Sequence, residues 1–246
     1  METSTVKVLG SHPSSFVNRV LIALNVKSVD YELFQEDMSN KSELLLKSNP
    51  VHKKIPVLFH GDNPICESLI IVQYIDETWT NGPSILPSDP HDRAIARFWA
   101  TYIDDKVLVS TQSFLVNFMY DHLVTFDVRA WESTRREAKS EVQEKLIEAL
   151  LPLEEAFVKC SKGKSFFGGY NIGYVDIALG CILGYIKAIK IMFGVDIFDV
   201  TKTPGLVNWA DRFLEDKAVK DVILKPEELV EILKVYLAKR QVANAN

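Results

Sequence analysis

The segment from Asn49 to Ser68 constrains the fold of this chain more than any other stretch. Pro56 begins a short apolar run there. Because proline cannot donate to a sheet ladder, Pro56 belongs at the start or edge of a strand, and its bond to Ile55 can be cis. Gly61, Asp62 and Asn63 have turn chemistry, so residues 56–66 are predicted to form a β-hairpin. Polar side chains flank the hairpin on both sides, which indicates a binding site for a small polar molecule.

The composition limits the class of protein. The 246 residues are enough for one large or two modest domains, and 47% hydrophobic with 25% charged residues is typical of a globular protein in water. A net charge of −5 argues against non-specific nucleic-acid binding. Three cysteines without a Cys-x-x-Cys motif favour a reducing compartment. The N-terminus lacks signal-peptide features, and the apolar run 177–186 is about half of the ~20 residues that span a membrane. We therefore expect a cytosolic protein that binds neither nucleic acid nor membrane.

The N-terminal third predicts a small mixed sheet. Residues 6–9 and 31–35 have strand patterns, and the apolar spacing from Phe16 is that of a helix between them. A crossover of this length implies a parallel β-α-β unit. Shorter helices are predicted over 41–47 and 68–78, on either side of the hairpin. This order of elements predicts a four-stranded, thioredoxin-like domain.

A linker separates this domain from the rest of the chain. Residues 81–90 carry three prolines and a glycine, the strongest linker composition in the sequence. Strand patterns fade after it. We therefore predict a thioredoxin-like domain over 1–82, a linker over 83–92 and an all-helical domain over 93–246.

Two long helices are expected first in the helical domain. Helical periodicity runs over 91–122 and again over 131–162, where Pro152 should kink or re-start the helix. The conformation of 119–128 is left open.

A buried helix should follow these two. Residues 174–193 are almost wholly apolar and predict one continuous central helix, with Asp176 placed to accept from N–H groups at its start. Thr203-Pro204 and Pro226 begin the two remaining helices.

Several long strings of residues are similar to one family. The chain resembles plant tau-class glutathione transferases along nearly its whole length. The densest matches are Phe16-Val17-Asn18-Arg19-Val20, Glu36-Asp37-Met38-Ser39-Asn40-Lys41-Ser42, Asn49 to Pro56, Pro64-Ile65-Cys66-Glu67-Ser68, Asp89 to Ala94, Arg97-Phe98-Trp99-Ala100 and Phe167-Gly168-Gly169. The resemblance implies a thioredoxin-like domain with an all-helical second domain, a homodimer, and detoxifying transfer of glutathione to hydrophobic electrophiles. It also implies glutathione-dependent peroxidase activity as an additional possibility, with glutathione as co-substrate and no other cofactor.

The chemistry of this transfer defines what a catalytic residue must do. A free thiol has a pKa near ~8.5, so most of it is protonated at neutral pH. Lowering that pKa by ~2 units requires roughly 2.7 kcal/mol of preferential thiolate stabilisation. A hydroxyl donor together with a helix N-terminus can supply this. Ser14, at the break before the first helix, matches the family's catalytic serine, although serine there is also an ordinary N-cap.

The resemblance also assigns residues that bind glutathione. Lys41 and Lys54 match the positions that bind its glycine carboxylate, and the main chain of Ile55 matches the residue that pairs with the cysteinyl unit. Glu67 would hold the ammonium group, and Ser68 would meet the γ-glutamyl carboxylate at a helix N-terminus. Taken singly, surface lysines are more often solvated charges, and the Glu-Ser pair is more often a cap.

The second substrate is expected between the two domains. The positions that correspond to the family's pocket are Phe16, Leu108, Gln112, Leu115 and Tyr185. Such residues are more often plain core. Three positions depart from the family pattern: His12 and Leu115 stand where tryptophan is common, and Ser15 stands where proline is usual. The spacing of the five histidines predicts no metal site.

Two other functions are compatible with the same residues. A non-catalytic carrier of hydrophobic metabolites could use the same fold, since fold does not fix function. A glutathione-dependent thiol-disulfide exchanger would need a cysteine at the start of the first helix, where this chain has Ser14 and Ser15. The second alternative is therefore disfavoured.

Overall fold

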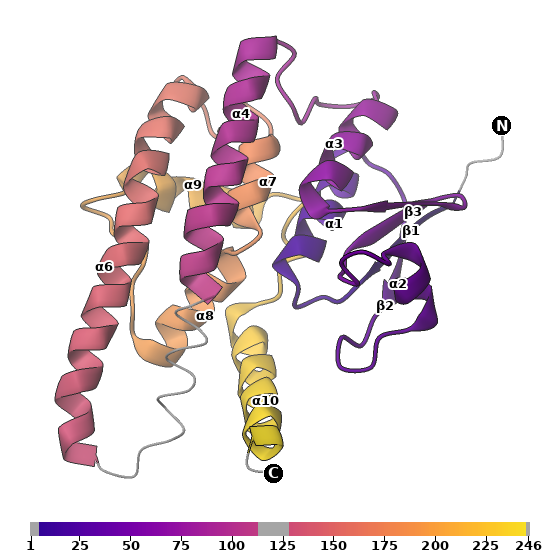
Figure 1. Cartoon of the computed structure of the whole chain (residues 1–246). Coiled ribbons are helices and arrows are strands. Elements are labelled where there is room, and N and C mark those ends of the chain that lie inside the picture. Colours follow the sequence, from indigo (N-terminus) through magenta and orange to yellow (C-terminus); the bar gives the residue numbers. More distant parts are fainter. Residues whose placement is uncertain (1–4, 113–127, 245–246) are drawn as a thin grey trace.

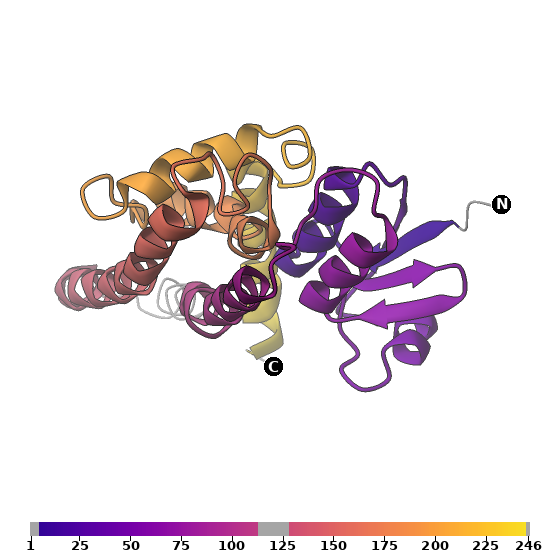
Figure 2. The same cartoon turned by 90° about the horizontal axis from the view of Figure 1, so that it is seen from above.

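The protein consists of an α/β part and a helical part that pack side by side (Figures 1 and 2). The computed structural model describes residues 5–112 and 128–244, without the side chains of 128–142 and 236–244. Among the described residues, no helix combines the length and apolar character needed to cross a membrane.

Four strands form one mixed sheet in the order β2-β1-β3-β4. β1 pairs with β2 in parallel, whereas the pairs β1–β3 and β3–β4 are antiparallel. The strands are β1 (Val6–Gly10), β2 (Glu32–Gln35), β3 (Val57–His60) and β4 (Asn63–Cys66). The predicted hairpin is β3–β4, and the Ile55–Pro56 peptide bond immediately before it is cis. The predicted thioredoxin-like layout is confirmed.

Helices cover both faces of this sheet. Helices α1 (Ser15–Val26) and α3 (Ser68–Thr78) lie between the sheet and the helical part (Figure 2). The short helix α2 (Glu43–Ser48) lies on the other face, where its buried Leu45 packs with Leu9 and Val57. Alternation along β1 explains this division, because Val8 contributes to the main core and Leu9 faces α2.

The segment between α3 and the helical part is held in place by one acidic side chain. The two carboxylate oxygens of Asp76 accept hydrogen bonds from the N–H groups of Ile85 and Leu86, each at 2.9 Å. The same carboxylate forms a buried ion pair with Lys27 at 2.7 Å. Helix α4 (Pro90–Tyr102) follows, and Asp89 directly before it accepts from its first N–H groups as the N-cap.

The first long helix of the helical part changes its hydrogen-bond pattern. α4 continues into a π-helical segment, η1 (Ile103–Leu108), and the chain remains helical as far as residue 112. The predicted helix over 91–122 is confirmed up to that point. Helix α6 (Val128–Ser161) runs through Pro152 without interruption, so the helix does not re-start there. Most of the segment 119–128 lies outside the described residues.

The prediction of one continuous helix over 174–193 is wrong. The structure has two helices, α7 (Tyr174–Gly180) and α8 (Leu183–Phe193). The reason is that the Ala178 carbonyl, which would accept from Ile182 N–H in a continuous helix, accepts a hydrogen bond from Arg19 at 3.0 Å instead. The N–H group of Ile182 bonds to Leu179 O, one residue closer.

The fold ends with two helices that begin at the predicted prolines. These are α9 (Pro204–Glu215) and α10 (Pro226–Asn244). The combination of a four-stranded α/β domain with a helical domain agrees with the fold class expected from the sequence. The exact division at residues 83–92 stays a prediction.

Candidate functional site

The strand register brings the predicted glutathione-binding segments to one end of the sheet. Gly10 at the end of β1 pairs with Gln35 at the end of β2, so the chain segments that lead to Ser14 and Lys41 leave the sheet together. Val57 at the start of β3 lies opposite both Leu9 and Cys66. The chain on either side of the hairpin, which carries Lys54–Ile55 and Glu67–Ser68, therefore meets the same end.

Ser14 sits at the N-terminus of α1, as predicted. Its side-chain oxygen accepts a hydrogen bond from Val17 N–H at 3.3 Å, which makes it the N-cap. Its own N–H donates to Ser11 O at 2.9 Å and closes a turn over His12 and Pro13. A hydroxyl that accepts in this way still has its O–H free to donate. Capping and donation to an anion at the helix N-terminus are therefore compatible in one residue.

A cavity of about 250 Å³ opens next to this serine. It brings together five residues from the sequence prediction, namely Ser14, Phe16, Leu108, Gln112 and Tyr185. Ser15, noted in the sequence as a departure from the family pattern, also lines it, as do Thr111 and Ile182, which the prediction did not include. Leu115 lies outside the described residues.

The cavity joins the two parts of the molecule. The Tyr185 hydroxyl, from α8, donates a hydrogen bond to Pro13 O in the turn before Ser14. Burial raises the pKa of Tyr185 to about 12, so its phenol stays protonated as the donor. The turn that positions Ser14 is thus held directly by the helical part.

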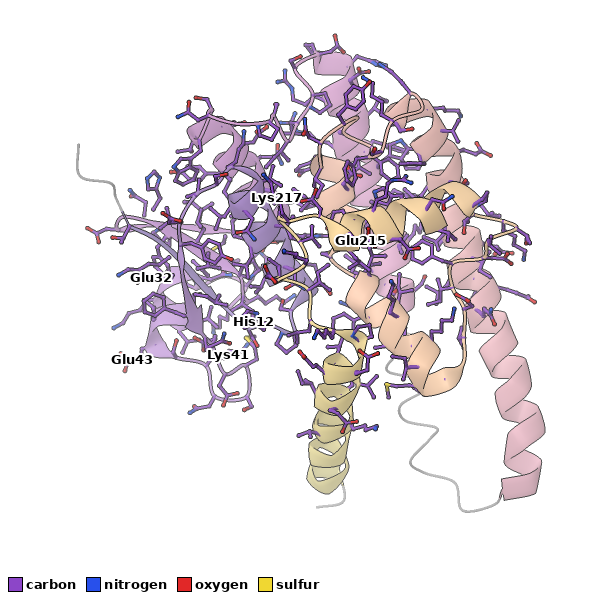
Figure 3. The ribbon with its side chains drawn as sticks, turned by 180° about the vertical axis from the view of Figure 1, so that it is seen from behind. His12, Glu32, Lys41, Glu43, Glu215 and Lys217 are labelled. Atoms are coloured by element: carbon purple, nitrogen blue, oxygen red, sulfur yellow. The ribbon has the colours of Figure 1, made fainter. Side chains whose placement is uncertain are left out.

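Lys54 is presented by a loop built on Asn49. The buried amide of Asn49 donates to Lys54 O at 2.9 Å and accepts from His52 N–H at 3.1 Å. The side chains of Lys54 and Lys41 are exposed, and Figure 3 shows Lys41 projecting from the loop that follows β2. Ile55 is half-buried between Lys54 and the cis proline.

Glu67 and Ser68 stand at the start of α3. Glu67 has a φ of 69°, a left-handed conformation that costs energy for any residue with a side chain. Its carboxylate is exposed and lies 3.8 Å from the Nε2 atom of His52. Ser68 is buried, and its hydroxyl accepts a hydrogen bond from Arg19 at 3.3 Å. The helical ladder begins only at Ile71, so the N–H groups of the first turn are not used within the helix.

Arg19 is a central residue that the sequence prediction missed. Its guanidinium is fully buried and forms two hydrogen bonds with Asp104 of η1, at 2.5 and 3.2 Å. It also donates to Ser68, to Ala178 O and to the sulfur of Cys181. One side chain of α1 therefore contacts α3, η1 and the α7–α8 junction. The sequence did contain a signal for this residue, because Arg19 is a charged residue among the apolar positions of the first helix.

The charge of Arg19 is maintained by its partners. Burial alone would lower the pKa of the guanidinium, but the Cys181 thiol and the Asp104 carboxylate raise it above its ordinary value. The Ser68 hydroxyl thus has a permanent cation behind it, on the side away from solvent.

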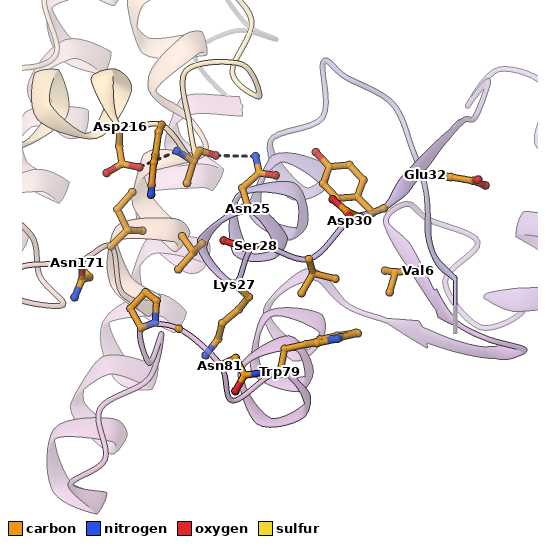
Figure 4. A pocket seen from close by; sticks show the side chains of 18 of the residues that line it. Val6, Asn25, Lys27, Ser28, Asp30, Glu32, Trp79, Asn81, Asn171 and Asp216 are labelled. Atoms are coloured by element: carbon orange, nitrogen blue, oxygen red, sulfur yellow. Dashed lines mark hydrogen bonds between the residues drawn. The ribbon is translucent and has the colours of Figure 1, made fainter. Parts of the chain in front are cut away.

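A larger cavity of about 1020 Å³ lies at the other end of α1 (Figure 4). It is lined by both parts of the molecule, including Lys27, Asp30, Trp79 and Asp216. None of the residues predicted to bind glutathione or the second substrate lines it. Ser14 and the described residues of the predicted second-substrate pocket line the smaller cavity at the N-terminus of α1 instead.

A group of three exposed side chains could in principle hold a metal ion. Asp89, His91 and Asp92 gather at the start of α4. The Asp89 carboxylate accepts from the N–H groups of Asp92 and His91, bonds that lower its pKa and explain its position as a helix cap. The absence of a metal site stays a prediction.

Comparison with known proteins identifies the relatives of this chain. The model for the N-terminal domain of glutathione S-transferases matches residues 4–77, and the model for the C-terminal domain matches residues 95–217. Glutathione S-transferase U17 of Arabidopsis thaliana is 50% identical over 242 residues, which cover 98% of this chain and all of the relative.

Solved structures agree with this similarity. The tau-class glutathione S-transferase from mango, Mangifera indica, is 52% identical with a TM-score of 0.82, covering 95% of this chain and 99% of that one. Rice GST1 in complex with glutathione is 29% identical with a TM-score of 0.78, covering 97% and 99%.

Proposed function

The chain belongs to the tau class of glutathione S-transferases, and from this premise we propose that it transfers the thiolate of glutathione to hydrophobic electrophiles. The observation that carries the proposal is the position of Ser14. A hydroxyl with a free O–H stands at the N-terminus of α1 and at the edge of an interdomain cavity.

Ser14 acts as the donor that stabilises the thiolate. A hydrogen bond from its O–H and the positive end of α1 both favour the ionised sulfur, each by about 1–3 kcal/mol. Together they lower the thiol pKa enough to populate the nucleophile at neutral pH. The serine itself gains and loses no proton in this scheme.

Five further residues hold the peptide. Lys41 and Lys54 pair with the glycyl carboxylate, and the main chain of Ile55 pairs with the cysteinyl unit. The γ-glutamyl carboxylate meets the Ser68 hydroxyl and the first N–H groups of α3, while Glu67 pairs with the ammonium group. Their common position at one end of the sheet supports this division of roles.

The electrophile enters the cavity next to Ser14. Phe16, Leu108 and Tyr185 supply apolar surface, and Gln112 supplies a polar group at its wall. Ser15, one of the departures from the family pattern, also lines this cavity.

The test is a comparison of two neighbouring serines. Ser14→Ala should lower the turnover of glutathione with 1-chloro-2,4-dinitrobenzene at least about tenfold, the loss of roughly 1.4 kcal/mol of transition-state stabilisation. The KM for glutathione should change much less. Ser15→Ala is the matched control, because Ser15 is buried beside the same cavity but does not cap the helix.

Three results would contradict the proposal or part of it. Full activity of Ser14→Ala with a loss in Ser15→Ala would move the catalytic role by one residue. Glutathione binding in calorimetry without conjugation of any of a panel of electrophiles would favour the carrier function. We also propose that the protein forms the homodimer of its family, and a monomeric mass in sedimentation experiments would contradict that assembly.

A further inference from the structure

Glu36 is an acidic residue in an unusual environment. It follows β2 directly and is only 7% exposed, although glutamate is rarely buried unless it is paired. Both carboxylate oxygens bond to one residue. Oε1 accepts from Ser42 N–H and Oε2 from the Ser42 hydroxyl, each at 2.7 Å. These are short, charge-assisted bonds, which are the stronger kind.

The two bonds close the loop that carries Lys41. Ser42 is the N-cap of α2 and accepts from Leu45 N–H at 3.1 Å, so the Glu36 carboxylate fixes the place where that helix begins. Lys41 is the residue immediately before Ser42, and its side chain is exposed. Holding the N–H and the hydroxyl of Ser42 therefore fixes the backbone from which Lys41 projects.

Glu36 is also tied to the strand that leads to Ser14. Its N–H donates to Gly10 O at 2.8 Å, the last residue of β1. The turn that closes on Ser14 begins at Ser11, the next residue. Glu36 thus connects Gly10, which directly precedes the turn that closes on Ser14, to Ser42, which directly follows Lys41.

We propose that Glu36 is a positioning residue for glutathione, which sets the distance between the Lys41 ammonium and the Ser14 hydroxyl. The inference rests on the proposed function, in which Ser14 and Lys41 contact opposite parts of one peptide. A ligand held at two points gains affinity only when the two contacts are spaced correctly beforehand. Glu36 touches neither the thiol nor the carboxylate. It acts through Ser42 and Gly10.

Glu36→Gln tests this with little change in shape. The amide carbonyl can still accept from Ser42 N–H, but its NH2 group must donate to the Ser42 hydroxyl instead of accepting from it, so both bonds lose the charge of the carboxylate and are weakened. We expect the KM for glutathione to rise about tenfold while kcat stays within about twofold. The reason is that the interaction of Lys41 with the glycyl carboxylate, which is weakened, is the same in the bound substrate and in the transition state. Glu32→Gln, on the exposed β2 position four residues earlier, is the control and should change neither constant.

Glutathione ethyl ester, in which the glycyl carboxylate is blocked, shows which end of the ligand is affected. The wild type should bind the ester more weakly than glutathione, and this difference should become smaller in Glu36→Gln, in which Lys54 alone still recognises the carboxylate. A purely structural role would raise the KM for glutathione and for the ester by the same factor, and this result would overturn the inference.

Double variants identify the residue through which Glu36 acts. The effects of Glu36→Gln and Lys41→Gln should not add, since both remove the same contact, whereas Glu36→Gln and Lys54→Gln should add. Additive effects with Lys41→Gln would overturn the inference even if the wild type conjugates glutathione. Absence of conjugation by the wild type would instead contradict the proposed function. If Glu36→Gln does not fold, Ser42→Ala removes one of the same bonds and should raise the KM for glutathione, but not for the ester.

Discussion

The glutathione-binding loops and the junction around Arg19 are held together in opposite ways. In the loops that carry Lys41 and Lys54, the positioning side chains bond within a few residues of themselves, as Glu36 does with Ser42 and Asn49 does with Lys54. Arg19 bonds to groups 49, 85, 159 and 162 residues away. The local bonds fix the backbone of the predicted ligand site, whereas the long-range bonds of Arg19 hold the α/β part and the helical part together. Changes in the junction should therefore affect stability first, and changes in the loops should affect binding first.

The largest effect is expected at the junction. Arg19→Met keeps the length of the side chain but leaves Asp104, Ser68 and Ala178 O without their partner. Removing one member of a fully buried charged pair costs about 3–5 kcal/mol. Because the Asp104 side chain is 35% exposed, the free energy of unfolding in denaturant should fall by about 3 kcal/mol, the lower end of that range. Arg212→Met is the control, because the exposed Arg212 bonds only to Ser165 O in the described structure. Equal losses in the two variants would remove the distinction between the regions.

A second buried charged group, in the helical part, gives a pH-dependent effect. Asp176 is fully buried and accepts hydrogen bonds from Phe167, Gly168, Gly173 and Trp209. Burial raises its pKa to about 6, and these donors limit the rise. An unfolded aspartate titrates near ~3.9, so the folded state binds the proton more tightly. The stability gained from the protonated form is present below pH ~4 and is lost as the pH rises to about 6.

Asp176→Asn removes this titration. The difference in unfolding free energy between wild type and variant should therefore shrink by about 2–3 kcal/mol between pH 4 and pH 7. Asp196→Asn, an exposed residue paired with Lys190, should show no such trend. A difference that grows with pH would mean that the four donors outweigh burial and that the native state prefers the carboxylate.

The smallest change in stability is expected in a loop. Asn49→Ala removes the bonds to Lys54 O and His52 N–H, both of which reach water when released, so unfolding should become easier by only about 1 kcal/mol. The KM for glutathione should rise about tenfold, because the backbone under Lys54 and Ile55 is no longer fixed. Asn208→Ala, on the exposed face of α9, should change neither quantity. A large loss of stability in Asn49→Ala with an unchanged KM for glutathione would contradict the claim that changes in the loops affect binding first.

The same contrast explains what could be predicted from the sequence. The hairpin, the cap at Ser14 and the acceptor role of Asp176 toward Gly173 follow from bonds between near neighbours in the chain, and all three were predicted. The break between α7 and α8 could not be predicted, because it depends on Arg19, which lies 159 residues before the carbonyl it bonds. The apolar pattern of residues 174–193 does not indicate that the Ala178 carbonyl bonds to Arg19.

The candidate site shows the same limits. Ser14, Phe16, Leu108, Gln112 and Tyr185 were named from resemblance and line one cavity in the structure. Residues that hold the loops of the site, without belonging to the predicted contacts, were missed. Glu36 and Asn49 are ordinary polar residues in the sequence, and only the folded loops show what their side chains hold.

The most direct test of the account is the pKa of the glutathione thiol while it is bound. It can be followed by the ultraviolet absorbance of the thiolate as a function of pH, in the wild type, in Ser14→Ala and in Ser15→Ala. We predict a bound pKa clearly below the free value of ~8.5 in the wild type and in Ser15→Ala, and a return toward ~8.5 in Ser14→Ala. A bound pKa that stays equally low in Ser14→Ala would contradict the role of this serine in generating the nucleophile.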